Sequence, residues 1–114
     1  MNSNYPRRGK YNHQIEQALK RYGVNLSDFA LEQISSRIVR RHESCTCIFN
    51  KVPDTKGIID GARQVWRVKY EGTDFLLVFR AKDNTGGNNE VITFLPSDQD
   101  FFSDGRQKGN KPGR

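Results

Sequence analysis

The stretch from Gln64 to Lys82, QVWRVKYEGTDFLLVFRAK, contains two strand-like runs on either side of a glycine-containing segment. Apolar and polar side chains largely alternate along 64–70, whereas 75–82 begins with five apolar residues and has two basic ones at its end, and successive side chains of each strand point to opposite faces. The segment Glu71-Gly72-Thr73-Asp74 is typical of a four-residue turn. The two runs are therefore expected to pair as an antiparallel hairpin.

Two further runs flank this hairpin. Residues 45–49 and 90–95 also have strand character, and Pro96 ends the second of them. Residues 51–62 and 83–89 are rich in Gly, Asn, Asp and Pro, which favours loops. Connections this short are typical of an antiparallel meander of three to four strands.

Helical periodicity precedes the strands. Ile15, Leu19 and Tyr22 recur at helical spacing before Gly23, which predicts a helix over 12–22. A second helix is expected from an N-cap at Ser27 to about His42. Its apolar stripe consists of Leu31, Ile34 and Ile38. The predicted fold class is α+β, with two N-terminal helices packed on one face of a small antiparallel sheet.

Length and composition indicate one domain. The 114 residues are 34% hydrophobic, which is enough for one small core. We expect a single domain over 12–102 between basic tails at 1–11 and 103–114. The longest apolar run, Phe75–Phe79, is far shorter than a membrane span, and no secretion signal is apparent, so a cytoplasmic location is expected.

The two cysteines, Cys45 and Cys47, are one residue apart. Side chains at this spacing on a strand are poorly placed for a disulfide, so two reduced thiols are expected. With only two histidines, His13 and His42, the chain offers few ligands for zinc. No metal site and no cofactor are predicted.

Basic residues predominate, with a net charge of +6 and a pI of about 9.6. The excess lies in the termini and in the hairpin, whereas residues 83–104 hold five acidic and no basic residues. This distribution favours a polyanionic partner such as nucleic acid. A basic surface that only keeps the protein in solution is the alternative.

Alternation assigns the basic residues of the hairpin to one face. Trp66, Val68 and Tyr70 are expected to face the helices, and the next strand adds Phe75, Leu77 and Phe79 to this set. The opposite face then carries Arg67, Lys69, Arg80 and Lys82, with Thr93 or Ile92 on the last strand, and Arg63 joins this set if its strand begins early. Like charges placed side by side repel one another, so a phosphate site is one interpretation and a solvated face is the other.

The end of the second helix adds the remaining candidates. Arg40 and Arg41 suit the negative end of the helix dipole, and they are also candidates for nucleic-acid binding. His42 follows them and is the candidate acid–base group, although a histidine there can equally cap the helix. His13 is expected to be an ordinary surface residue.

The order of these parts resembles a known superfamily. A helix ending in Arg-Arg-His, a glycine-containing loop, WRVKY–EGTD–FLLVFR and a closing VITFLP are similar to the barnase–EndoU–colicin–RelE superfamily of small metal-independent ribonucleases and toxins. The resemblance covers roughly residues 27–96. It implies a toxin-like endoribonuclease in which the ribose 2′-hydroxyl of RNA attacks the phosphate.

The resemblance also implies roles for particular residues. His42 would act as general base or acid, and Lys69 with Arg67 and Arg80 would stabilise the developing charge. Thr93 or Tyr70 would position the phosphate or the ribose, although Tyr70 is expected on the core face. The nucleic-acid-binding set would comprise Arg40, Arg41, Arg63, Arg67, Lys82 and Thr93. No residue is assigned as the second proton-transfer group. RNA is the expected partner, together with a protein antitoxin or host target.

Two other functions remain open from the residues. A non-catalytic inhibitor or adaptor of phage or plasmid type would use the same sheet to bind a protein or nucleic-acid surface. A DNA-binding module would use Arg37, Arg40 and Arg41 on the second helix, but no helix-turn-helix spacing precedes them.

Overall fold

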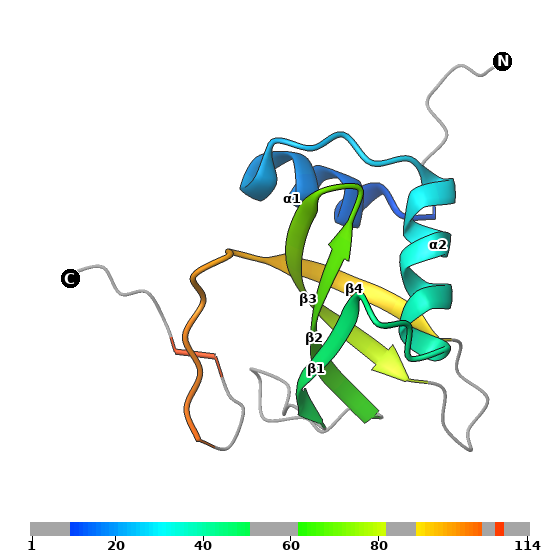
Figure 1. Ribbon diagram of the computed structural model, residues 1–114. Coiled ribbons are helices and arrows are strands. Elements are labelled where there is room, and N and C mark those ends of the chain that lie inside the picture. Colours follow the sequence, from blue (N-terminus) through cyan, green and yellow to red (C-terminus); the bar gives the residue numbers. More distant parts are fainter. Residues whose placement is uncertain (1–9, 51–61, 82–88, 104–106, 109–114) are drawn as a thin grey trace, which may run out of the picture.

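A computed structural model describes residues 10–50, 62–81, 89–103 and 107–108. Within these residues the elements are α1 (Asn12–Tyr22), α2 (Asp28–Val39), β1 (Cys45–Asn50), β2 (Ala62–Tyr70), β3 (Thr73–Ala81) and β4 (Glu90–Leu95). The strands form one antiparallel sheet in the order β1-β2-β3-β4, and the helices pack against it (Figure 1). The fold class is therefore α+β, as predicted. Most of both predicted tails, nearly all of the two predicted loops and Lys82 lie outside the described residues.

The helices begin and end on local signals. The Ser27 hydroxyl accepts a hydrogen bond from the Ala30 amide at 3.1 Å, which caps α2. Gly23 ends α1 in the left-handed conformation, with a φ of 69°. Neither helix in the described part of the chain combines the length and the apolar character that crossing a membrane requires.

The second helix ends earlier than predicted. It ends at Val39, and Arg41 adopts a φ of 58°. The amides of Arg41 and His42 donate to the carbonyls of Ile38 and Arg37, at 3.1 and 2.9 Å. These two bonds define a Schellman motif, in which the left-handed position is usually glycine. The prediction that residues 40–42 form the last helical turn was therefore wrong, because the chain reverses at Arg41.

The β2–β3 hairpin turns more tightly than predicted. Glu71 and Gly72 have φ values of 48° and 85°, and Tyr70 pairs directly with Thr73. Positive φ at both central residues is the signature of a two-residue type I′ turn, whose twist matches that of the strands. Thr73 and Asp74 thus belong to β3 and not to the turn.

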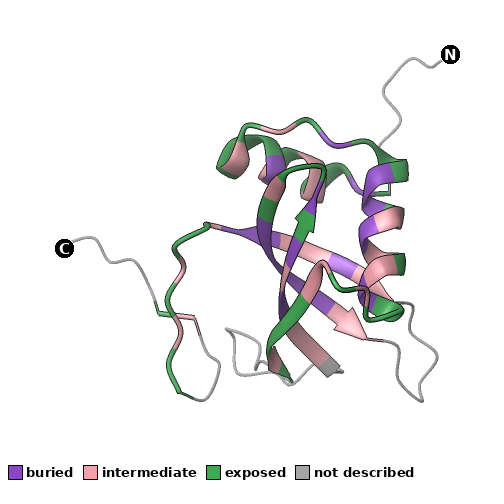
Figure 2. Ribbon diagram, viewed as in Figure 1, coloured by how far each residue is buried: buried purple, intermediate pink, exposed green. Residues whose placement is uncertain are grey.

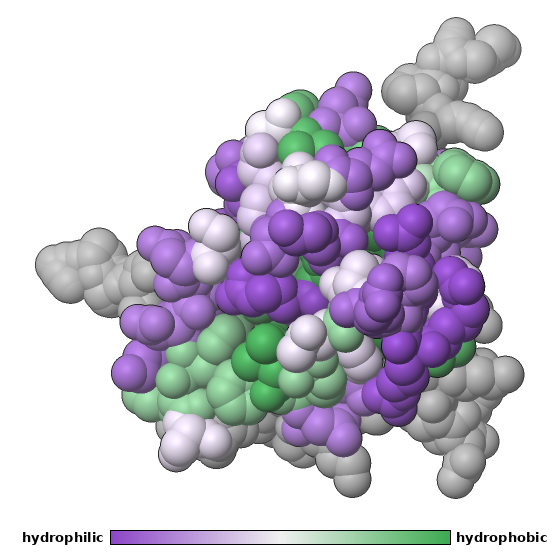
Figure 3. Space-filling model, in the orientation of Figure 1, coloured by the Kyte–Doolittle hydropathy of each residue, from purple (hydrophilic) through white to green (hydrophobic). Residues whose placement is uncertain are grey.

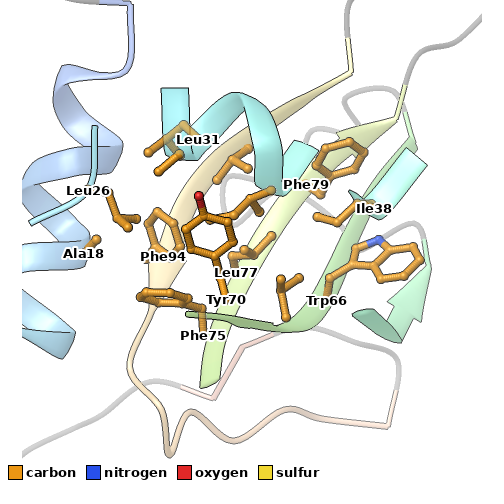
Figure 4. Close-up of a cluster of buried hydrophobic side chains, with 14 of the residues drawn as sticks. Ala18, Leu26, Leu31, Ile38, Trp66, Tyr70, Phe75, Leu77, Phe79 and Phe94 are labelled. Atoms are coloured by element: carbon orange, nitrogen blue, oxygen red, sulfur yellow. The ribbon is translucent and has the colours of Figure 1, made fainter. Parts of the chain in front are cut away.

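The main core lies between the helices and one face of the sheet. Trp66 and Phe79 contribute to it from the sheet, while Leu31 and Ile38 come from α2 (Figure 4). Tyr22 anchors α1: its hydroxyl accepts from the Leu76 amide at 2.9 Å and donates to the Leu95 carbonyl at 2.6 Å. The predicted helix-facing set of the hairpin is confirmed.

The opposite face of the sheet has an apolar centre. Val65, Leu76, Val78 and Leu95 are all at most 4% exposed there. Phe101, from the segment after Pro96, packs against this cluster, and its ring centre lies 5.1 Å from that of Phe49. The interpretation of this face as an open basic surface was therefore wrong at its centre, because the C-terminal segment helps to cover it.

The outer strand β1 is the most exposed part of the sheet (Figure 2). Its register with β2 shifts between Cys47 and Phe49, which marks a bulge at Ile48. A bulge on an edge strand interrupts the regular row of backbone donors and acceptors, and this discourages pairing with another strand.

Candidate nucleic-acid interface

The basic residues of the hairpin share one face, but they form two separate groups. Arg63 pairs directly with Arg80 at the open end, whereas Arg67 lies opposite Leu76 nearer the turn. Four residues of strand separate the Cα atoms of Arg63 and Arg67 by roughly 13 Å. The buried pair Val65 and Val78 lies between the two groups. The predicted single cluster of cations is thus divided by apolar side chains.

Near the turn, an acidic residue offsets the positive charge. The Arg67 guanidinium lies 3.7 Å from a carboxylate oxygen of Asp74, and Asp74 also pairs across the strands with Lys69. Arg67 and Asp74 are 39% and 52% exposed, so this ion pair contributes little to stability. It does reduce the charge available there for a phosphate.

At the open end, Arg63 and Arg80 are half-buried and their Nε atoms are fully buried. Two like charges directly opposite each other on a sheet are unfavourable unless their surroundings compensate. Their position agrees with the predicted face, and Lys82, which would extend this group, lies outside the described residues.

Thr93 is held by His13, a residue that was expected to be an ordinary surface side chain. Its hydroxyl oxygen lies 3.1 Å from Nε2 of His13 on α1. Thr93 also sits next to a register shift, where Val78 is followed by Phe79 on β3. His13 is exposed, as predicted, but it links α1 to β4 and occupies the hydroxyl proposed for phosphate positioning.

A second group of arginines lies on the helix side of the sheet. We define the helix-end patch as Arg37, Arg40 and Arg41. The Arg37 guanidinium lies 5.0 Å from the centre of the Tyr70 ring, and that of Arg41 lies 5.7 Å from the centre of Trp66. Both distances are within the range of cation–π attraction. Because Trp66 and Tyr70 face the helices, the patch and the hairpin arginines lie on different sides of the sheet.

The helix-end patch has a net positive charge. Across the described ranges, none of its three guanidinium groups lies within ion-pair distance of a carboxylate. Arg40 and Arg41 are exposed and Arg37 is half-buried. Figure 3 shows hydrophilic side chains gathered over the end of α2, and apolar ones over β1 and the C-terminal segment.

His42 is oriented by its own backbone. Its Nδ1 accepts a hydrogen bond from the Ser44 amide at 3.1 Å and lies 2.8 Å from the Ser44 hydroxyl. An amide can only donate, so Nδ1 carries the lone pair and a neutral ring carries its proton on Nε2. A histidine that takes up a proton at Nε2 needs the opposite tautomer, with Nδ1–H held by an acceptor. This arrangement favours hydrogen-bond donation by His42 over proton abstraction.

The two cysteines lie beside the patch on β1. Cys45 pairs with Val68 and Cys47 with Trp66, and both are free thiols. Burial raises the pKa of both thiols above the ordinary value, and the neighbouring arginines oppose this only in part. These surroundings therefore do not activate either thiol toward its thiolate form. Among the described residues, no group of three or more His, Cys, Asp or Glu side chains is placed to hold a metal ion.

A small pocket opens next to the patch. It has a volume of about 180 Å³ and lies between the end of α2 and the open end of the β2–β3 hairpin. Its lining combines apolar, aromatic, amide and guanidinium groups. These residues are Ile38, Val39, Arg41, Gln64, Trp66, Phe79, Ala81 and Asn89.

Sequence reasoning selected Arg40 and Arg41 as binding residues and Arg37 only for the alternative of a DNA-binding module, and it did not find the pocket. The available signal was the equal spacing of two pairs, Arg37 with Arg41 and Trp66 with Tyr70, each four residues apart. That spacing became informative only once the helix end was placed over β2.

Comparison with known proteins gave no match: no family model, no curated protein and no solved structure is significantly similar to the chain. The resemblance to the barnase–EndoU–colicin–RelE superfamily stays a prediction.

Proposed function

We propose that this protein binds single-stranded RNA through the helix-end patch. The observation that carries the proposal is that Arg37, Arg40 and Arg41, which follow one another at the end of α2, have no carboxylate partner in the described residues. Two of the three guanidinium groups lie over aromatic rings. Charge that is left uncompensated and partly immobilised is suited to an external anion.

The chemistry of arginine supports a phosphate ligand. A guanidinium group donates two parallel hydrogen bonds to a phosphate, and it keeps its charge at every physiological pH. An aromatic ring beneath the guanidinium limits its freedom before binding, which lowers the entropy lost when the phosphate arrives. His42 would add one hydrogen bond from Nε2 to a phosphate or ribose oxygen.

Three phosphate contacts give a quantitative expectation. For a single strand, the logarithm of affinity falls with the logarithm of salt with a slope of about −0.7 per contact, or roughly −2 here. A fourfold rise in salt should therefore weaken binding roughly 20-fold. A partner bound mainly by apolar contacts would show no such loss.

The direct test is fluorescence anisotropy with labelled single-stranded RNA in a chelator. We expect Arg40→Ala/Arg41→Ala to weaken binding roughly 10-fold or more and to reduce the salt slope by about 1.4. The matched control is Lys20→Ala/Arg21→Ala, which removes the same charge from the end of α1. An equal loss of RNA affinity in both double variants would show that overall charge, and not the patch, determines binding. The absence of binding by the wild type would contradict the proposal.

Metal-independent RNA cleavage is a second proposal, favoured by the position of His42 directly after the patch. For His42 to accept the 2′-hydroxyl proton, its ring must give up the hydrogen bond from Ser44 and take the Nδ1–H tautomer. Incubation of the same RNA in chelator tests this, with cyclic phosphate ends as the expected product and their absence in His42→Ala. Binding of RNA without cleavage would support the binding proposal and contradict the cleavage proposal. A protein that neither binds nor cleaves RNA would favour the adaptor function.

A further inference from the structure

We propose that the pocket beside Arg41 binds a nucleobase, so that the protein recognises a base as well as phosphates. This inference rests on the proposed function, because it assigns the base that belongs to a strand held by the helix-end patch. The observation behind it is that one side chain, Arg41, both belongs to the patch and lines the pocket.

The size of the pocket suits one heterocycle. A volume of about 180 Å³ is smaller than the pockets of several hundred Å³ that hold whole drug-sized ligands. A single planar ring system fits such a volume, while its ribose and phosphate would stay outside, where Arg40 and Arg41 are exposed.

The lining offers an aromatic surface. Trp66 forms part of the wall and lies at the end of the core cluster, beside Ile38 (Figure 4). It is only 3% exposed because the core packs around it, and the Arg41 guanidinium lies over its ring. Stacked planar groups lie roughly 3.5 Å apart, so a ring inserted between the two needs about 7 Å.

The guanidinium of Arg41 now lies 5.7 Å from the ring centre, so a little over 1 Å of outward movement would be required. Arg41 is exposed, and a phosphate on its outer side would favour that movement. The base would thus take the place of the guanidinium on Trp66, and the guanidinium would move onto the phosphate.

The polar groups of the pocket can read the edge of a base. The Gln64 Oε1 accepts from the Trp66 indole N–H at 2.7 Å, and its Nε2 donates to Asn50 at 3.1 Å. A side-chain amide has two acceptor sites and two donors, so one of each is left on Gln64 beyond these bonds. A donor next to an acceptor is the pattern with which glutamine pairs with a base.

Trp66 is the single tryptophan of the chain and therefore a direct reporter. The experiment titrates the full chain with the four nucleoside monophosphates, with ribose 5-phosphate and with inorganic phosphate at constant ionic strength. Excitation is at the red edge of the tryptophan band, where bases do not absorb. We expect at least one nucleotide to change Trp66 fluorescence saturably and to bind at least about fivefold tighter than ribose 5-phosphate, as stacking of one base implies.

Variants of the amide test its role. Gln64→Ala should reduce the preference among the four nucleotides. Gln64→Glu should reduce it too, and because this variant keeps an acceptor for the Trp66 indole N–H, the loss cannot be attributed to that hydrogen bond. Gln17→Ala is the matched control, because that amide lies on α1 and contacts Arg21. Thermal unfolding of each variant shows whether the fold is intact.

An abasic oligonucleotide separates this inference from the proposed function. We expect it to bind through the patch more weakly than the intact strand and without a change at Trp66. The pocket proposal would be overturned by two results together. The abasic and intact strands would bind equally, and the nucleotides would change neither the Trp66 fluorescence nor the backbone amide resonances of Gln64, Ala81 and Asn89. RNA binding by the patch would still stand. Nucleotides that bind here while no RNA binds at the patch would overturn the proposed function alone.

Discussion

Arg41 holds its guanidinium 5.7 Å from the centre of the Trp66 ring, and it does so from a backbone φ of 58°. A side chain other than glycine, asparagine or aspartate in this conformation costs about 1–2 kcal/mol. Strained positions of this kind occur preferentially at sites of function. The chain thus has an arginine at a position where a helix end normally has glycine, and this conformation places its guanidinium over Trp66.

The first prediction concerns this strain. Glycine relieves it and alanine does not, so Arg41→Gly should be more stable than Arg41→Ala by about 1 kcal/mol, as measured by urea unfolding. Both variants lose the same guanidinium and should bind RNA equally weakly. At the exposed helical position Ser36 the order should reverse, with Ser36→Gly about 1 kcal/mol less stable than Ser36→Ala. The same order at both positions would contradict the left-handed conformation.

The second prediction concerns the tautomer of His42. Because the Ser44 amide donates to Nδ1, nitrogen NMR of the neutral ring should show the proton on Nε2. His13, whose Nε2 faces a hydroxyl that can either donate or accept, is the internal comparison. A neutral His42 with its proton on Nδ1 would remove the objection to proton abstraction and strengthen the case for cleavage.

How far the sequence determines this fold depends on the range of each interaction. The hairpin of β2 and β3 follows from local alternation, and the faces of Trp66 and Leu77 were predicted from it. The burial of the opposite face of the sheet was not predicted. Val65 and Val78 are buried there by contacts that include Phe101, which is more than 20 residues away along the chain. Alternation identifies the two faces of a strand but not what packs against each.

The candidate site shows the same division. The two hairpin arginine groups were placed on the correct face, and the apolar residues between them were overlooked as a barrier. The stacking of Arg41 was not predictable, because a left-handed helix end is ordinarily recognised by a glycine that this sequence lacks at that position.

The third prediction tests the C-terminal segment. Phe101 packs on the second apolar cluster, whereas its neighbour Phe102 is 41% exposed. Phe101→Ala should destabilise the protein by about 1–3 kcal/mol, less than a fully buried phenylalanine because Phe101 is half-buried. Phe102→Ala removes an exposed ring that lies 5.5 Å from the Lys108 ammonium group, and it should cost less than about 1 kcal/mol. Equal effects of the two substitutions would show that this segment does not cover the sheet.

The fourth prediction concerns the hydroxyl of Tyr22, which bridges the Leu76 amide and the Leu95 carbonyl. Tyr22→Phe leaves both backbone groups without this partner and should cost about 1–3 kcal/mol in urea unfolding. Tyr11→Phe is the control: among the described residues that hydroxyl reaches only Glu32, at 3.5 Å, and its loss should cost under about 0.5 kcal/mol. Similar costs for both tyrosines would contradict the bridging role.

The last prediction is the pH dependence that this hydroxyl confers. Burial raises the pKa of Tyr22 above its ordinary value of 10.0, and the hydrogen bond from the Leu76 amide opposes the rise only in part. The folded protein therefore holds this proton more tightly than the unfolded chain. Its contribution to stability is complete below pH 10 and falls as the pH rises through the folded pKa.

Unfolding free energies measured from pH 8 to pH 11 should therefore decline more steeply for the wild type than for Tyr22→Phe, which has no such proton to lose. Lysines and cysteines titrate in both proteins, so only the difference between the two curves reports on Tyr22. A difference that stays constant above pH 10 would show that the hydroxyl is not buried between β3 and β4.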